Sequence, residues 1–140
     1  MVHALGEIRR VLLRDGILID LRPLLEYAPL EVVSASETRL AGTADQLPDD
    51  RAGDEAANRA VAQVEGQDWF IKEREDFFPF NYYWDSPTEM QQYLEAEWSN
   101  SVTVDEEVWR NVRSMWAVAN ADALVRIQLK MLITRWRKKA

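Results

Sequence analysis

Cysteine is absent from this sequence of 140 residues, and its single histidine, His3, lies close to the N-terminus. Without cysteine there is no disulfide framework and no thiol chemistry. One histidine without cysteine argues against a transition-metal cluster, and a Ser-His-Asp device would have to use His3. We therefore expect no metal site and no catalytic residues of these classes.

Glycine is sparse, because the five glycines are scattered singly along the chain. The P-loop and the dinucleotide-binding fingerprint each need several glycines within a few residues, so neither motif is present. No stretch of about 18 apolar residues occurs, and residues 1–10 lack the apolar run of a signal peptide. We therefore expect no membrane partner and a cytoplasmic protein.

The net charge of −7 argues against nucleic acid as a partner, since a phosphate backbone binds a basic surface. The last fifteen residues are nevertheless basic, with three arginines and three lysines. One interpretation is a solvated strand edge and tail. The other is an anion site or a contact with an acidic surface of a second subunit.

The hydrophobic patterns predict one domain, 1–140, of the α+β class. We expect a mostly antiparallel sheet with helices packed mainly on one face. Predicted strands are 17–22, 30–35, 38–43, 69–84 and 125–134, and 30–35 with 38–43 is predicted to form a hairpin with a tight turn at Ser36-Glu37. Predicted helices are 3–14, 54–64, 87–98 and a fourth that follows a Thr103–Glu106 capping box and ends near Asn120. In 54–64 the alanines and valines at positions 56, 57, 60, 61 and 64 form a narrow stripe. The polar stretch 45–53 is predicted to be a loop.

Several local patterns carry more detailed predictions. Gly16 lies where a left-handed residue could end the first helix. The next strand, 17–22, is almost continuously apolar, which is typical of a strand buried on both faces. Pro79 has no N–H and favours an edge position or a bulge. Residues 125–134 alternate, with odd-numbered residues forming the apolar series.

The stretch 76–90 holds six aromatic residues and predicts a strand that meets a helix. Ser86 is a natural N-cap, Pro87 falls at the first helical position, and Glu89 completes a capping box. Such a junction is a packing centre and could also form one wall of a pocket.

Polar residues next to this aromatic strand and within the apolar strand 17–22 predict a ligand site. Asp20 and Arg22 point to the same face of their strand, either as a strand-end ion pair or as a polar pair at a pocket mouth. The aromatic residues are core residues or a ligand platform. The candidate ligand-binding residues are Asp20, Arg22, Tyr82, Tyr83, Trp84 and Asp85.

The segment ALGEIRRVLLRDGILIDLRP resembles class I S-adenosylmethionine-dependent methyltransferases. In that family a helix ending in RVLxPGG leads into an apolar strand late in the sheet. Arg10, Val11 and Leu12 match this motif, Arg14-Asp15 replace its proline and glycine, and Gly16 matches its last glycine. The match covers about twenty residues; farther along, only the order of elements is similar.

This resemblance implies the C-terminal half of a Rossmann-like methyltransferase without the Gly-rich, cofactor-binding half. We expect a methyltransferase-like domain that is not an enzyme alone and acts through binding or self-assembly. It would use S-adenosylmethionine only if a partner supplied the missing half. The alternatives are a small-ligand-binding protein or enzyme with an aromatic pocket at the strand ends, and a truncated methyltransferase.

A homodimer is also expected. In the parent family the strand matching 17–21 has a neighbour on each side, and one neighbour would belong to the missing half. Its absence would leave an apolar edge with unpaired main-chain groups, which proteins cover or pair. Six tryptophans also favour an interface.

Overall fold

The computed structural model describes residues 1–139 and confirms the α+β class, with a six-stranded, mostly antiparallel sheet and four helices. In chain order the elements are α1 (Val2–Val11), β1 (Ile17–Leu24), β2 (Ala28–Val33), β3 (Thr38–Gln46), α2 (Pro48–Gly66), β4 (Phe70–Trp84), α3 (Pro87–Glu97), β5 (Val102–Thr103), α4 (Glu106–Ala117) and β6 (Leu124–Lys138).

These elements form two compact units, and each is described by itself. The first unit comprises residues 1–23, 51–78 and 131–139, and the second comprises residues 24–50 and 79–130. Strands β4 and β6 contribute residues to both units. In the sheet, β6 pairs with β1, β2 and β4, while β3 lies between β2 and β5.

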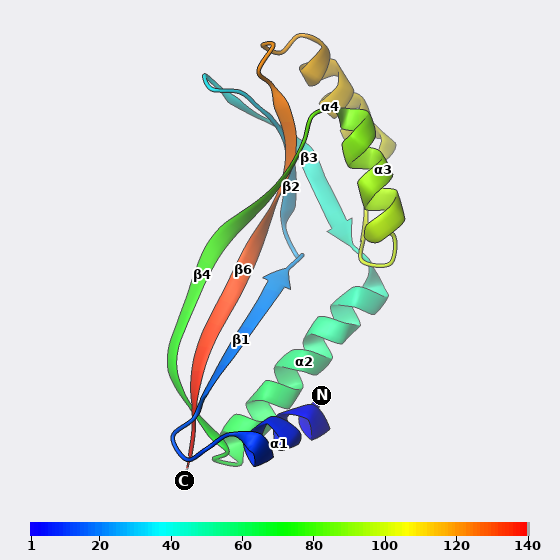
Figure 1. Ribbon diagram of the computed structural model, residues 1–140. Helices are drawn as coiled ribbons and strands as arrows, with labels where there is room; N and C mark the ends of the chain where they lie inside the picture. Colours follow the sequence, from blue (N-terminus) through cyan, green and yellow to red (C-terminus); the bar gives the residue numbers. More distant parts are fainter. Residues whose placement is uncertain (140) are drawn as a thin grey trace. The chain divides into compact units, whose positions relative to one another are not determined.

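In the first unit, α1 and α2 lie on the same side of β1, β4 and β6 (Figure 1). Val64 of α2, Phe70 of β4 and Trp136 of β6 form its buried cluster. The predicted stripe of small residues on α2 is confirmed at Ala57, Ala60 and Val64, which are buried, and is wrong at Ala56, which is exposed. Helices on one face of the sheet are thus confirmed for this unit.

Strand β1 was predicted to be buried on both faces, and this is wrong. Its residues alternate, so Leu18, Asp20 and Arg22 are half-buried on the helix-covered side. Ile19 and Leu21 are 52% and 53% exposed on the other side. The reason is that helices cover only one side of this strand.

The end of α1 also differs from the prediction at Gly16. The helix ends at Val11, and Leu12 is already extended. Asp15 takes the left-handed conformation, with φ of 58°. Aspartate tolerates that conformation better than most residues, so the glycine is not the left-handed residue here.

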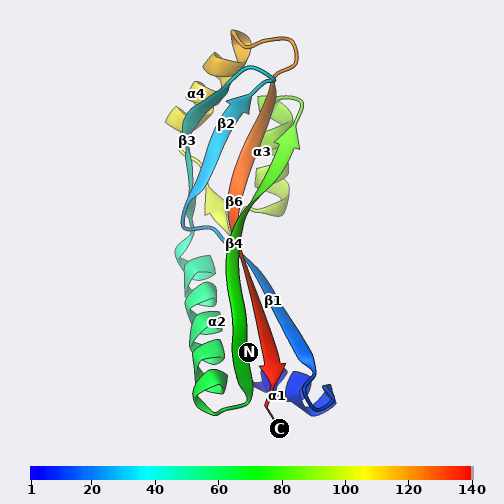
Figure 2. The ribbon, with the colours of Figure 1, turned by 90° about the vertical axis from the view of Figure 1, so that its left-hand side faces the viewer.

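The predicted hairpin is confirmed in the second unit, where β2 and β3 pair antiparallel. The Ser34 N–H closes the turn by donating to the Glu37 carbonyl. In Figure 2 the strands of this unit lie in front of α3 and α4, so the helices again cover one face. Trp109 and Val112 of α4 are buried in this unit.

A bulge in β3 fixes α4 against the hairpin. Leu30 pairs with Gly42 and Glu31 pairs with Leu40, so Ala41 is the extra residue. The Asn111 side chain of α4 donates a hydrogen bond to the Ala41 carbonyl, at 3.1 Å. The carbonyl of the bulged residue, which lies outside the regular strand pairing, is thus bonded by the helix instead.

The loop predicted for 45–53 is wrong, because β3 runs to Gln46 and α2 begins at Pro48. Proline is well suited to the first helical position. Asp49 and Asp50 lie in the first turn, where negative charge favours the helix dipole. The polar composition that suggested a loop is thus a helix start.

The start of α3 follows the prediction closely. Ser86 Oγ accepts the Glu89 N–H at 3.2 Å. The Glu89 carboxylate accepts the N–H of Asp85 rather than that of Ser86. The predicted box at Thr103 and Glu106 is wrong: Thr103 lies in β5 and Asp105 is the N-cap of α4.

The long strands β4 and β6 are both confirmed. Because β4 pairs only with β6 among the strands of residues 1–139, Pro79 lies on an edge strand, as predicted.

The burial of β6 agrees with the prediction only in part. The predicted odd-numbered apolar face holds in the second unit, where Val125, Ile127 and Leu129 are buried. It is wrong in the first unit, whose buried residues are Leu132, Thr134 and Trp136.

Gly42 provides a test of the contact between β3 and α4. A Cβ atom at Gly42 would lie 2.6 Å from Val108 Cγ2. We therefore expect Gly42→Ala to lower the free energy of unfolding by about 1–3 kcal/mol, measured by urea denaturation followed by circular dichroism. Adding Val108→Ala should recover part of that loss, because it removes the clashing atoms.

Gly53→Ala is the control, because no atom lies within 4 Å of its added Cβ. Gly53 lies within α2, so alanine there should stabilise the protein by about 0.5–1 kcal/mol. A Gly42→Ala variant as stable as the parent would contradict the close approach of α4.

Candidate functional site

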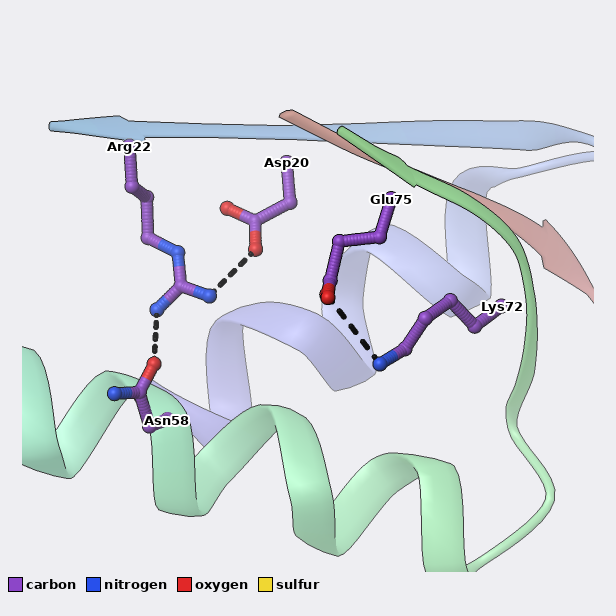
Figure 3. A network of polar contacts seen from close by, with 5 residues as sticks. All are labelled: Asp20, Arg22, Asn58, Lys72 and Glu75. Atoms are coloured by element: carbon purple, nitrogen blue, oxygen red, sulfur yellow. Dashed lines mark hydrogen bonds and ion pairs between the residues drawn. The ribbon is translucent and has the colours of Figure 1, made fainter. Parts of the chain in front are cut away.

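The predicted polar pair forms on the helix-covered side of β1. Arg22 Nη2 lies 3.0 Å from Asp20 Oδ2, and Arg22 Nη1 donates to Asn58 Oδ1 of α2 at 2.8 Å. Figure 3 shows both side chains reaching from β1 toward α2. The two residues were therefore correctly placed on one face, and they link this strand to a helix.

This pair keeps unused hydrogen-bonding capacity. The Asp20 and Arg22 side chains are only 20% and 21% exposed. Arg22 Nε has no hydrogen-bond partner among residues 1–139, and the contact at Asp20 Oδ2 lacks the alignment of a hydrogen bond. Arg22 Nε is thus a buried donor without a partner, which costs about 1–3 kcal/mol, whereas Asp20 Oδ2 keeps its ionic contact with Arg22.

Further charged residues from β4 lie on the same side of the first unit (Figure 3). Lys72 Nζ is 3.4 Å from Glu75 Oε2 and 5.3 Å from the centre of the Trp136 ring. The helix-covered side is therefore partly polar, whereas β1 presents aliphatic residues to the outside. This arrangement inverts the usual pattern of a sheet with one covered face.

A cavity of about 350 Å³ adjoins the ion pair within the first unit. Its volume lies at the lower end of the range typical of small-molecule sites. Most of its walls are apolar side chains of α1, β1, α2, β4 and β6. The wall residues are Met1, Ala4, Leu5, Ile8, Leu18, Ile19, Leu21, Val61, Val64, Phe70 and Trp136, together with Asp20 and Arg22.

The other four candidate residues belong to the second unit. Tyr82 and Trp84 pack with Tyr93 of α3 and with Trp98, the residue that caps the end of this helix. The Tyr82 and Trp98 rings lie edge to face, 5.1 Å between centres, and the Trp84 and Tyr93 rings lie 5.4 Å apart. Aromatic pairs of this geometry stabilise packing, so these residues join α3 to β4.

Tyr83 points away from that cluster and is 48% exposed. Its hydroxyl lies 3.5 Å from Arg126, which also bonds Glu31 at 2.6 Å. Burial would lower the Arg126 pKa, but the hydrogen bonds and charges of Glu31 and Tyr83 raise it above its ordinary value. The Arg126 guanidinium therefore stays charged, and its bond to Glu31 ties β2 to β6. Asp85 is exposed and receives no side-chain role.

Four of the six basic C-terminal residues have partners in the first unit. Arg135 and Arg137 both contact Glu73 of β4. Lys139 lies 2.8 Å from Asp68, and Lys138 Nζ donates to the Leu12 carbonyl. These contacts favour a paired strand end over a free anion site.

Sequence patterns missed most of the cavity. Helical spacing placed Val61 and Val64 on the stripe of α2, but nothing local indicated that Phe70 and Trp136 would meet it. Asn58, which accepts a hydrogen bond from Arg22, is an exposed polar residue between the buried Ala57 and Ala60, and nothing in the sequence indicated its role.

Within residues 1–139, no group of three or more His, Cys, Asp or Glu side chains could hold a metal ion.

A second hollow of about 350 Å³ lies in the second unit, against Leu94, Val102 and Trp109. Glu95 is its one acidic wall residue, and no candidate residue lines it. We therefore take the cavity beside Asp20 and Arg22 as the candidate site.

The ion pair can be tested by charge removal. Arg22→Met should destabilise the protein by about 1–3 kcal/mol, because it leaves the mostly buried Asp20 carboxylate without its cation. The double variant Asp20→Leu/Arg22→Met should recover most of that loss, since an apolar pair can replace a buried ion pair. Urea denaturation measures both effects.

Arg74→Met is the matched control in β4. Arg74 pairs with Asp76 at 2.9 Å, but these side chains are 76% and 56% exposed. The control should therefore change the free energy of unfolding by less than about 1 kcal/mol. Equal effects of Arg22→Met and Arg74→Met would show that the Asp20–Arg22 pair is no more important than a surface pair.

Comparison with known proteins identifies no relative. No protein-family model, no curated protein and no solved structure matches this chain. No helix in the described residues is long and apolar enough to cross a membrane. The similarity of the segment from Ala4 to Pro23 to methyltransferases thus stays a prediction.

Proposed function

We propose that this chain is a non-catalytic binding protein whose first unit holds a small apolar molecule with one polar end group. The observation that carries this proposal is the apolar cavity beside a half-satisfied ion pair. Apolar walls with a few polar groups at one point are typical of small-molecule sites.

The residue types at the cavity favour binding over catalysis. No histidine, serine, threonine, tyrosine or lysine is among the described residues that line it. These are the common nucleophiles and proton-transfer groups of enzymes. Arg22 supplies charge and hydrogen bonds, and Asp20 is engaged with it at 3.0 Å.

The polar end group can be specified by the atoms that lack hydrogen-bond partners. Arg22 Nε needs an acceptor, and Asp20 Oδ2, which lies 3.0 Å from Arg22 Nη2, can accept a further hydrogen bond. A neutral primary amide carries both an acceptor and a donor. A carboxylate carries only acceptors, and its charge would be repelled by Asp20. We therefore expect aliphatic amides to bind more tightly than the matching carboxylates.

A nuclear magnetic resonance titration with octanamide and octanoate tests this proposal. Octanamide should shift amide signals of α1, β1 and α2. It should bind about two- to tenfold more tightly than octanoate, the factor for one additional hydrogen bond. Ala4→Phe should weaken binding, because Ala4 is an exposed residue that lines the cavity and a larger side chain there would obstruct it.

Ala56→Phe is the control, because Ala56 is an exposed α2 residue that does not line the cavity. It should bind octanamide like the parent. Unchanged binding by Ala4→Phe, or shifts confined to the second unit, would contradict the proposed site. The predicted methyltransferase-like character adds a further comparison: S-adenosylmethionine should leave the spectrum unchanged, and micromolar binding would favour a cofactor-binding enzyme.

A further inference from the structure

The outward face of β1 is unusually apolar for an edge strand. Ile17, Ile19 and Leu21 are 36%, 52% and 53% exposed, while the charged Asp20 and Arg22 lie on the covered side. Among the strands of residues 1–139, β1 pairs only with β6. Edge strands of monomeric proteins usually carry charges, prolines or bulges that prevent pairing. Pro23 and the inward-pointing Asp20 and Arg22 are features of this kind in β1, whereas the outward positions 17, 19 and 21 are all aliphatic.

The open edge of β1 presents the main-chain groups of its odd-numbered residues. The Gly16 carbonyl accepts the Lys138 N–H of β6, so even-numbered residues direct their main-chain groups toward β6. Ile17, Ile19 and Leu21 therefore direct theirs away from it. Pro23 falls in the same series, where its missing N–H costs no bond to β6.

We propose that two copies of this chain pair through their β1 edges, antiparallel, about a twofold axis at Leu21. Leu21 of each copy then exchanges two main-chain hydrogen bonds with Leu21 of the other. Ile19 of each copy donates to the Pro23 carbonyl of the other, while the Ile19 carbonyl receives no main-chain bond in return because proline has no N–H. A twofold pair is the commonest form of self-assembly.

Charge selects this register. With the axis at Leu21, Asp20 of one copy lies opposite Arg22 of the other, and the same contact occurs twice. An axis at Asp20 would place two aspartates face to face, and an axis at Arg22 would place two arginines face to face. An axis at Ile19 would leave Asp20 opposite Leu18. Opposite charges stabilise cross-strand pairs and like charges destabilise them.

The distribution of charge also favours contact through the first unit. That unit has twelve basic and ten acidic side chains, a net charge of +2. The second unit has five basic and fourteen acidic side chains, a net charge of −9. Two copies of the second unit would repel each other, whereas two copies of the first nearly neutral unit would not.

Light scattering after size exclusion tests the interface. At about 100 µM the parent should have twice its mass of 16.3 kDa. Leu21→Lys should give the monomer mass, because two lysines would meet at the axis. Leu40→Lys is the matched control: Leu40 is 52% exposed on β3 in the second unit, so this variant should remain a dimer. A monomeric parent, or a dimeric Leu21→Lys variant, would overturn the proposal.

Charge exchange tests the register. Asp20→Arg alone would oppose arginines across the axis, and Arg22→Asp alone would oppose aspartates, so each variant should be monomeric. An equal mixture of the two should form a heterodimer, because both cross-axis pairs are then complementary. Circular dichroism checks that each variant is folded. A mixture that stays monomeric while Leu21→Lys disrupts the parent dimer would overturn the Leu21 axis.

Discussion

The side-chain alternation of β1 against β6 is the constraint on which both proposed sites depend. Since side chains alternate strictly along a strand, a shift of one residue would move every β1 side chain to the other face. The observed register directs Asp20 and Arg22 toward α2 and leaves Ile19 and Leu21 outside. The contact between Arg22 and Asn58 holds that register from the covered side.

This register has an energetic consequence on each face of β1. Inside, an ion pair with unused hydrogen-bonding groups borders an apolar cavity, so a ligand that satisfies those groups would gain free energy. Outside, burial of Ile19 and Leu21 against a second copy would stabilise the proposed dimer by about 25 cal/mol for each Å² of apolar surface removed from water. The same strand therefore favours a small molecule on one side and a second chain along its edge.

Local sequence patterns predicted the elements well and their burial less well. Capping at Ser86, the turn near Ser36 and the period-two run of β6 depend on neighbouring residues, and all three elements form. The covered face of β1 was not predictable, because Ile17, Leu18 and Ile19 are all apolar and give no alternation. The same holds at Met131, Leu132 and Ile133, where the buried series changes parity. The candidate site residues fall into both units because their placement depends on long-range strand pairing.

Residue-resolved hydrogen exchange of β1 at two protein concentrations tests the central claim most directly. The amides of Ile19 and Leu21 should be protected at high concentration and exchange rapidly at low concentration, because only a second copy pairs with them. The even-numbered amides of Leu18 and Asp20, which face β6, should be protected at both concentrations. Rapid exchange at Ile19 and Leu21 at every concentration would contradict self-pairing of this edge.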